Sequence, residues 1–312
     1  MALDSDFTAR VEPHRRELLA HCYRMLGSIQ DAEDLVQETL LRAWRARDRY
    51  DEAAASLRTW LYTIATNACL TALQGRARRP LPSGLGGPGD DPWTPLVPAF
   101  DIPWLQPFPV DPDARLQQRG TLRLALIAAM QQLPPRQRAV LILRDVLAFS
   151  AAETAQVLQT SPASVNSALQ RARAGLGGTV ETEVSEPADA TVRQVVDRYL
   201  QAFEAADVGG LVALLTEDVV MEMPPVPLWL RGRADYGRFM TRVFAMRGTD
   251  WRMRPLLANQ QPAAAAYCRD GNEYRLHTLQ VYTVTEAGLA ATVAFQDPAV
   301  FAAFGLESVV PK

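Results

Sequence analysis

The stretch 149–176 constrains this chain most, because it specifies two short helices separated by a tight turn. Ser150 followed three residues later by Glu153 is a capping box, in which hydroxyl and carboxylate bond backbone N–H groups left over at a helix start. Ser161 before Pro162 is a second start signal, since proline is tolerated in the first turn. We therefore predict a helix directly after each of these two serines.

The second of these helices has an apolar and a polar face. The apolar positions recur at helical spacing and are Val165, Ala168, Leu169, Ala172 and Leu176. The other faces carry serine, asparagine, glutamine and arginine, which bond to base edges and phosphates in a major groove. A helix-turn-helix places its second helix there, so DNA reading is one interpretation. A solvated surface helix in a bundle is the other.

A helix predicted near residues 31–45 is dense in acids in its opening half. Its apolar face, which we expect to be buried, consists of Ala32, Leu35, Val36, Thr39, Leu40, Ala43 and Trp44. Its opening half carries Asp31, Glu33, Asp34, Gln37 and Glu38. One or two acids would suffice to favour the positive helix end. The face is therefore also a candidate docking surface for a basic protein partner.

The following helix, predicted over 57–74, has the opposite character. Its apolar face consists of Leu57, Trp60, Leu61, Ile64, Ala65, Ala68, Cys69, Ala72 and Leu73. The remaining positions are Arg58, Thr59, Tyr62, Thr63, Thr66, Asn67, Thr71 and Gln74, and Arg76, Arg78 and Arg79 follow. Arginines neutralise phosphates and an aromatic ring stacks on unstacked bases, a combination that suits single-stranded DNA. Taken alone, a basic helix end is more commonly solvated surface.

In this order, the segments resemble a sigma factor of the extracytoplasmic-function (ECF) group of the sigma-70 family. The resemblance rests on residues 23–45, 56–73, 133–158 and 164–176. It implies two all-α sigma domains, a region 2 over residues 1–79 and a region 4 with a helix-turn-helix over 115–178. The implied partners are core RNA polymerase, through its β′ clamp and β flap, and promoter DNA.

The resemblance also assigns the site residues. The acids of 31–38 (Asp31, Glu33, Asp34, Gln37 and Glu38) would bind the clamp. The minus-ten contacts would be Arg58, Tyr62, Asn67, Arg76, Arg78 and Arg79. The minus-35 contacts would be Ser161, Ser164, Asn166, Ser167, Gln170, Arg171 and Arg173. Many relatives carry arginine or lysine where this chain has Thr63, Thr66, Asn166 and Ala168, so base preference and affinity stay open.

Residues 80–114 between the two helical domains are rich in proline and glycine and lack any period, which predicts a linker. Its apolar side chains are too numerous for a purely solvated spacer, so we expect parts of it to dock on a partner or another domain. These side chains are Trp93, Phe100, Trp104, Leu105 and Phe108. Residues 103–109 resemble a tryptophan-leucine-proline motif of sigma factors that carry an extra carboxy-terminal domain. In the ECF group, the linker enters the RNA-exit path of the polymerase.

A third domain is predicted over 188–312, after a spacer at 177–188. Two helices with a turn at 207–210 lead into a strand, and further strands are predicted at 252–259, 263–268, 276–285 and 289–295. Helices packed on a bent antiparallel sheet enclose a cone, a common ligand site. The run 198–219 resembles SnoaL-like and ketosteroid-isomerase-like domains. The predicted fold class is thus multidomain, two all-α sigma domains followed by an α+β cone.

Catalysis by the cone is not predicted. Tyr199 stands where ketosteroid isomerases have an oxyanion-stabilising tyrosine, but Met223 takes the position of the base and Glu222 points to the opposite face. Glu222, Glu273 or His277 remain candidates for a different acid–base reaction. The candidate lining of a regulatory pocket is Tyr199, Phe203, Trp229, Trp251, Tyr267 and His277. Core packing explains each of these residues equally well.

Composition limits the alternatives. A net charge of −3 argues against a protein that coats DNA non-specifically, and no apolar run is long enough to span a bilayer. The first residues lack a secretory signal, so we expect a cytoplasmic protein. Three cysteines far apart suggest neither a disulfide framework nor a zinc site, and no metal or cofactor is predicted.

We therefore expect a bacterial sigma factor whose carboxy-terminal domain regulates it through contact with region 2 or the linker. The sequence does not indicate whether a separate anti-sigma protein exists. Two alternatives remain: a DNA-binding regulator that acts without polymerase, and a SnoaL-like enzyme fused to a DNA-binding tether.

Overall fold

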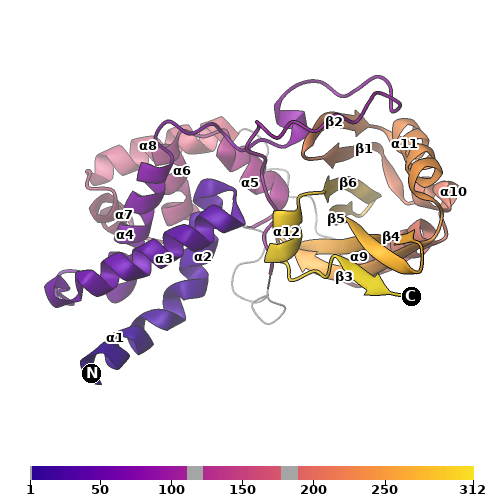
Figure 1. Ribbon diagram of the computed structural model, residues 1–312. Helices are drawn as coiled ribbons and strands as arrows, with labels where there is room; N and C mark the ends of the chain where they lie inside the picture. Colours follow the sequence, from indigo (N-terminus) through magenta and orange to yellow (C-terminus); the bar gives the residue numbers. More distant parts are fainter. Residues whose placement is uncertain (1, 111–121, 177–188) are drawn as a thin grey trace. The chain divides into compact units, whose positions relative to one another are not determined.

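The computed structural model describes residues 2–110, 122–176 and 189–312 (Figure 1). These residues form two compact units. The first contains 2–79 and 122–176, and the second contains 80–110 and 189–312. The spacer predicted at 177–188 lies outside the described residues.

The first half of the first unit is built from helices α1 (Ala2–Val11), α2 (Arg15–Leu26), α3 (Ile29–Arg45) and α4 (Leu57–Ala72). Gly27 ends α2 in the left-handed region, at φ 68°, where a glycine has no Cβ to clash. Ser28 and Ser56 then cap α3 and α4, because each hydroxyl accepts a bond from the backbone N–H three residues on. Short 3₁₀ turns at Glu12–His14 (η1) and Arg47–Arg49 (η2) complete this half.

The second half contains α5 (Leu124–Gln131), α6 (Pro135–Leu141), a π-helical turn η5 (Ile142–Val146), α7 (Ala151–Val157) and α8 (Pro162–Leu176). Both predicted helix starts are confirmed. The capping box is complete, with Glu153 N donating to Ser150 Oγ at 3.1 Å and Ser150 N donating to the Glu153 carboxylate at 2.8 Å. The apolar stripe of α8 is buried at Val165, Leu169, Ala172 and Leu176, so a helix-turn-helix forms as expected.

These two halves pack against each other within the unit. Helix α4 contacts α7, and α2 contacts α5. The guanidinium of Arg138 donates to the carbonyl of Met25 and, at 2.7 Å, to Oε1 of Gln131. Thr59 and Thr66, which the sequence placed on the polar face of α4, are buried, and Thr66 Oγ1 lies 3.0 Å from Nε2 of His21 on α2.

The second unit is built on one sheet with the strand order β2-β1-β6-β5-β4-β3, and β7 pairs with β5. The strands are β1 (Leu215–Met223), β2 (Val226–Arg231), β3 (Trp251–Ala258), β4 (Gln261–Asp270), β5 (Glu273–Thr285), β6 (Gly288–Phe295) and β7 (Val309–Pro311). Among the pairings of these described strands, only β1 with β6 is parallel. The helices are α9 (Asp189–Glu204), α10 (Val208–Ala213), α11 (Arg233–Arg247) and α12 (Pro298–Ala303).

The four later strands predicted from the sequence are confirmed as β3 to β6. Helix α11 was missed, since the sequence was interpreted as supplying only strands after β1. The turn predicted at 207–210 is instead the N-terminus of α10, which Asp207 caps by accepting a bond from Gly210 N at 2.9 Å. Gly288 starts β6 at φ 127°, where an added Cβ would lie 2.5 Å from the carbonyl oxygen of Leu214.

Residues 80–109, which we call the strap, lie along this sheet. Strand β2 is an edge strand, and Gly89 N donates to Trp229 O at 2.8 Å while Ala99 N donates to Pro225 O at 2.9 Å. The strap therefore covers a sheet edge whose backbone groups would otherwise be unpaired.

Side chains fasten the strap as well. Ser83 N donates to Glu222 Oε1 at 2.8 Å, and Arg242 Nη1 donates to two strap carbonyls, each at 2.7 Å. At the far end, Phe108 exchanges two 2.8 Å hydrogen bonds with Asn259. Of the apolar strap residues, Trp104, Leu105 and Phe108 are buried, whereas Trp93 and Phe100 are exposed.

Candidate functional site

Helix α8 presents the side chains assigned to duplex DNA. Ser161 Oγ accepts a bond from Ser164 N at 3.2 Å and so caps the helix. The exposed residues of α8 and its cap include Ser161, Ser164, Asn166, Ser167, Gln170, Arg171 and Arg173. Arg173 alone among these is fixed by a bidentate ion pair, with Asp145 of η5 at 2.9 and 2.8 Å. Helical periodicity gave no signal for Asp145, because it lies on a different element.

The acidic residues of α3 fall into two groups. Glu33, Asp34 and Gln37 are exposed, whereas Glu38 is half-buried and pairs with Arg42 at 2.6 Å. Asp31 is also half-buried, and its Oδ2 accepts bonds from Arg76 at 3.0 Å and Arg79 at 2.8 Å. The structure therefore joins an acid assigned to polymerase with two arginines assigned to DNA.

Trp44 departs from the predicted buried face of α3. Its side chain is 40% exposed, and the guanidinium of Arg47 lies 4.3 Å from the ring centroid. Leu41 is exposed in the same part of the helix. The last turns of α3 thus add two apolar side chains to a surface that the sequence described by its acids alone.

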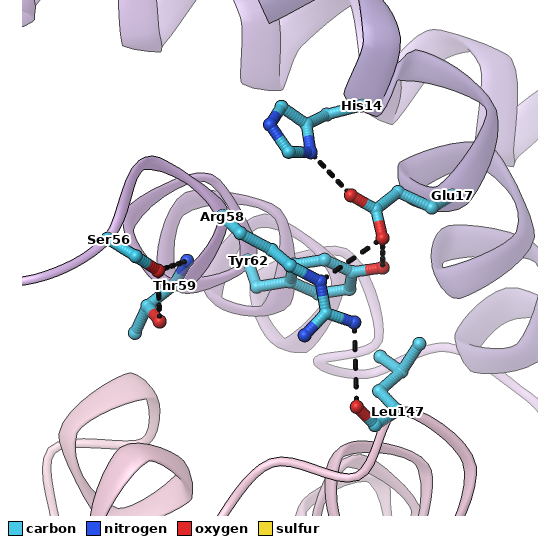
Figure 2. Close-up of polar contacts among 7 residues, drawn as sticks. All are labelled: His14, Glu17, Ser56, Arg58, Thr59, Tyr62 and Leu147. Atoms are coloured by element: carbon cyan, nitrogen blue, oxygen red, sulfur yellow. Dashed lines mark hydrogen bonds and ion pairs between the residues drawn. The ribbon is translucent and has the colours of Figure 1, made fainter.

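Arg58 and Tyr62 of α4 lie inside a polar cluster (Figure 2). Tyr62 is fully buried, and its hydroxyl donates to Glu17 Oε2 at 3.2 Å. Arg58 Nε donates to the same oxygen at 3.2 Å, and Arg58 Nη2 donates to Leu147 O at 3.5 Å. Burial, followed by the charge of Glu17, holds the pKa of Tyr62 well above its ordinary value.

An aromatic contact closes this cluster. The Phe149 ring lies 5.2 Å from the Tyr62 ring, and the Arg58 guanidinium lies 4.5 Å from the Phe149 centroid and 5.1 Å from that of Tyr62. Glu17 and Phe149 are contacts that sequence reasoning missed. Nothing in the spacing of α4 could indicate them, because they come from α2 and from the residue before the α7 cap.

The other residues assigned to the minus-ten element are dispersed. Asn67 is half-buried in α4, and Arg78 donates to Gln132 Oε1 at 2.9 Å. Arg76 and Arg79 are held by Asp31, as described above. The six side chains therefore do not form one continuous surface in this arrangement.

Four of the six candidate pocket residues meet inside the second unit. Tyr199, Phe203 and Trp251 share one core, and His277 lies 5.6 Å from the Trp251 ring. Burial, with a smaller contribution from Arg247, lowers the pKa of His277 to about 4. The hydroxyl of Tyr199 is hydrogen-bonded to that of Tyr236.

The other two candidates lie elsewhere. Tyr267 belongs to a separate cluster with Arg254 5.2 Å from its ring, and Trp229 donates through Nε1 to Gly86 O of the strap at 3.0 Å. Met223 packs in the core of the unit, whereas Glu222 contacts the strap, so the alternation expected on this strand is confirmed. Burial raises the pKa of Glu222, opposed by its bond from Ser83.

Within the described residues, no group of three or more histidine, cysteine, aspartate or glutamate side chains is arranged to hold a metal ion. No helix among those same residues has the length and apolarity needed to cross a membrane.

Three family models match the chain. Residues 10–79 match sigma-70 region 2, residues 123–176 match sigma-70 region 4, and residues 196–293 match a SnoaL-like domain. The ECF RNA polymerase sigma factor SigG of Mycobacterium tuberculosis is 47% identical over 311 residues, which cover 96% of this chain and 84% of SigG.

A second relative of the same organism supports the fold. The ECF RNA polymerase sigma factor SigJ is 32% identical over 247 residues, which cover 79% of this chain and 70% of SigJ. The crystal structure of SigJ matches with a TM-score of 0.66 at 25% identity, and covers 96% of this chain and 99% of that one. With both sigma-70 regions and the SnoaL-like domain in the same chain, this protein belongs to the ECF sigma factors of RNA polymerase.

Proposed function

We propose that this sigma factor reads the minus-35 element with α8, holds the minus-ten element with α4 and its basic end, and binds polymerase through α3. As a sigma factor it directs promoter-specific initiation by RNA polymerase. The observation that carries the residue assignments is the exposed row of serine, asparagine, glutamine and arginine on α8. Such side chains recognise base edges and phosphates in a major groove.

The polymerase contact is proposed to be the exposed side of α3 on the β′ clamp, with region 4 on the β flap. Glu33, Asp34 and Gln37 offer charge to a basic surface, and the exposed Leu41 and Trp44 offer apolar area beside them. Interfaces commonly combine a buried aromatic anchor with complementary charges. Since it acts with polymerase, we place the protein in the cytoplasm.

Transcription from a promoter library by core RNA polymerase tests these assignments. Gln170→Ala with Arg171→Ala should abolish promoter selection at the minus-35 element, and Arg136→Ala, an exposed arginine on α6, is the control. Glu33→Lys with Asp34→Lys should weaken core binding at least tenfold, with Asp197→Lys on α9 as the control for charge reversal. Full activity in both double variants would overturn the assignments.

The SnoaL-like domain is proposed to regulate the sigma regions through the strap, which connects region 2 to region 4. Its support is the set of strap contacts with Glu222, Arg242 and Asn259. A ligand of this domain would change activity only if it preferred one arrangement of the chain. We propose no turnover for the domain, because Met223 replaces the expected base and the Tyr199 hydroxyl already bonds Tyr236.

Loosening the strap tests this regulation. Arg242→Ala removes two bonds to the strap, whereas Arg238→Ala on the same helix removes only an exposed pair with Asp235. Transcription by the full chain should change with Arg242→Ala and not with Arg238→Ala. A chain ending at Gly178 should differ from the full chain in the same assay. Equal transcription by all four proteins would exclude a regulatory role.

A further inference from the structure

The cluster of Figure 2, together with Phe149 beside it, joins three elements that are distant in the sequence. Glu17 comes from α2, Arg58 and Tyr62 come from α4, and Leu147 and Phe149 come from the segment between η5 and α7. All of them belong to the first unit. The cluster therefore joins the half of the unit that matches region 2 to the half that matches region 4.

The contacts at this junction depend on one another. Glu17 receives bonds from both Arg58 and Tyr62 through a single oxygen, while its other oxygen lies 2.5 Å from Nδ1 of His14. The Arg58 guanidinium also lies near the Phe149 ring and bonds the carbonyl of Leu147. Charge-assisted hydrogen bonds are stronger than neutral ones, and removing one partner leaves a partly buried charge unpaired. Glu17 is thus the centre of the junction.

The junction also covers Tyr62 and part of Arg58, two of the α4 side chains assigned to DNA. Tyr62 has no exposed surface: the ring of His21 on α2 lies 5.0 Å from its ring, and Phe149, which is 2% exposed, lies 5.2 Å from it. An unstacked base that stacked on Tyr62 beside Arg58 would need the space that Phe149 fills. Phe149 and single-stranded DNA therefore cannot occupy this face together.

We infer that Glu17, Arg58, Tyr62 and Phe149 form a latch that holds the 122–176 helices closed over α4, and that single-stranded promoter DNA displaces Phe149 when it binds. This inference rests on the minus-ten role proposed for α4. If the latch-open chain is the competent form, the apparent affinity for DNA equals the affinity of the open form multiplied by the fraction of molecules that are open. Opening the latch then tightens DNA binding without adding any contact.

Fluorescence energy transfer in the full-length protein measures opening directly. Dyes are attached at Asp48→Cys and Ala174→Cys, both exposed, after Cys268→Ser removes the half-buried native thiol. Glu17→Gln keeps the side-chain shape and should raise the ratio of open to closed molecules about tenfold, the change that 1.4 kcal/mol produces. Phe149→Ala should raise it at least as much. Glu12→Gln is the control, since Glu12 forms an exposed ion pair with Arg15 at 2.8 Å, outside the junction.

Binding of a forked DNA with a single-stranded minus-ten segment, in the presence of core polymerase, is the second measurement. Glu17→Gln and Phe149→Ala should bind it up to tenfold more tightly than the parent chain. Gln156→Ala removes a 3.4 Å surface bond to Ala54 O and leaves the core intact. It should also raise the ratio of open to closed molecules and tighten binding of the forked DNA. Circular dichroism confirms that each variant is folded.

The two readouts separate the inference from the proposed function. Unchanged energy transfer in Glu17→Gln, Phe149→Ala and Gln156→Ala would overturn the latch, whatever the measured affinity for the forked DNA. Opening without tighter binding of the forked DNA would overturn both the displacement of Phe149 and the minus-ten role of α4. Opening together with tighter binding supports both.

Discussion

Arg79 donates from Nη2 to Oδ2 of Asp31 across 2.8 Å, so the basic end of region 2 is fastened to the first turn of the acidic helix α3. Arg76 shares that oxygen at 3.0 Å. Asp31 also lies near the positive end of α3, where a carboxylate is favoured. We therefore assign Asp31 a structural task that its neighbours Glu33 and Asp34 do not have.

Asp31→Asn should lower the free energy of unfolding of the first unit by about 1 kcal/mol, because two partly exposed ion pairs and a helix-end charge are lost. Glu33→Gln, at an exposed position of the same helix, should change it by less than half of that. Hydrogen exchange of the α3 amides reports both values. Equal losses in the two variants would contradict the distinction.

His21 should make stability depend on acid pH. Burial, then the charges of Arg24 and Arg58, lowers the pKa of this imidazole to about 3, whereas its ordinary value is 6.5. Between these values the unfolded chain binds a proton that the folded chain does not, so stability falls as the pH drops from 6.5 towards 3. The loss approaches about 5 kcal/mol at pH 3 and is absent above pH 6.5.

Nuclear magnetic resonance of the His21 ring nitrogens checks this pKa directly. His21→Gln should reduce the slope of unfolding free energy against pH in this window, because the glutamine side chain does not titrate. Glutamine can still bond Thr66, whose Oγ1 lies 3.0 Å from His21 Nε2, so the packing is kept. An imidazole that titrates near pH 6.5 in the folded protein would disprove the prediction.

Ser150→Ala should destabilise α7 by about 1 kcal/mol, because it removes the hydroxyl half of the capping box. Ser150→Asp restores an acceptor for Glu153 N and should recover most of this loss. Amide exchange along α7 measures the effect, and equal exchange in the alanine and aspartate variants would speak against capping as its cause.

Gly288→Ala should cost the SnoaL-like domain more than 2 kcal/mol, because φ is 127° and the new Cβ would approach the Leu214 carbonyl oxygen at 2.5 Å. Gly271→Ala is the matched control, since it has φ 64° and no atom within 4 Å of an added Cβ, and should cost about 1 kcal/mol. Thermal unfolding of the two full-length variants compares them. Similar melting temperatures would refute the steric argument.

Individual helices and strands of this chain could be predicted from local sequence patterns. The capping box at Ser150, the apolar stripe from Val165 to Leu176 and the strands β3 to β6 follow from spacing and turn residues, which act within a few positions. Helix α11 was missed because it lies between strands, where no polar cap marks its start: Gly232 precedes it without a side-chain cap bond.

Contacts between distant segments were not readable. Tyr62 and Thr66 occupy the polar side of α4 by spacing, yet both are fully buried. Periodicity reports one buried face, and it fails for a helix covered on two sides. For the same reason the pairing of Arg173 with Asp145 could not be predicted, since the partner lies on another element.

The strap has a consequence for how such a protein can evolve and be engineered. The chain enters the second unit at residue 80, before region 4, and the strap is hydrogen-bonded there to Glu222, Arg242 and Asn259. A gene shortened after region 4 would still encode the strap but no longer the strands and helix that bond it. Gain or loss of the last domain therefore requires matching changes in the codons for residues 80–109. Although region 4 separates the strap from the last domain in the sequence, the two should be exchanged between homologues together.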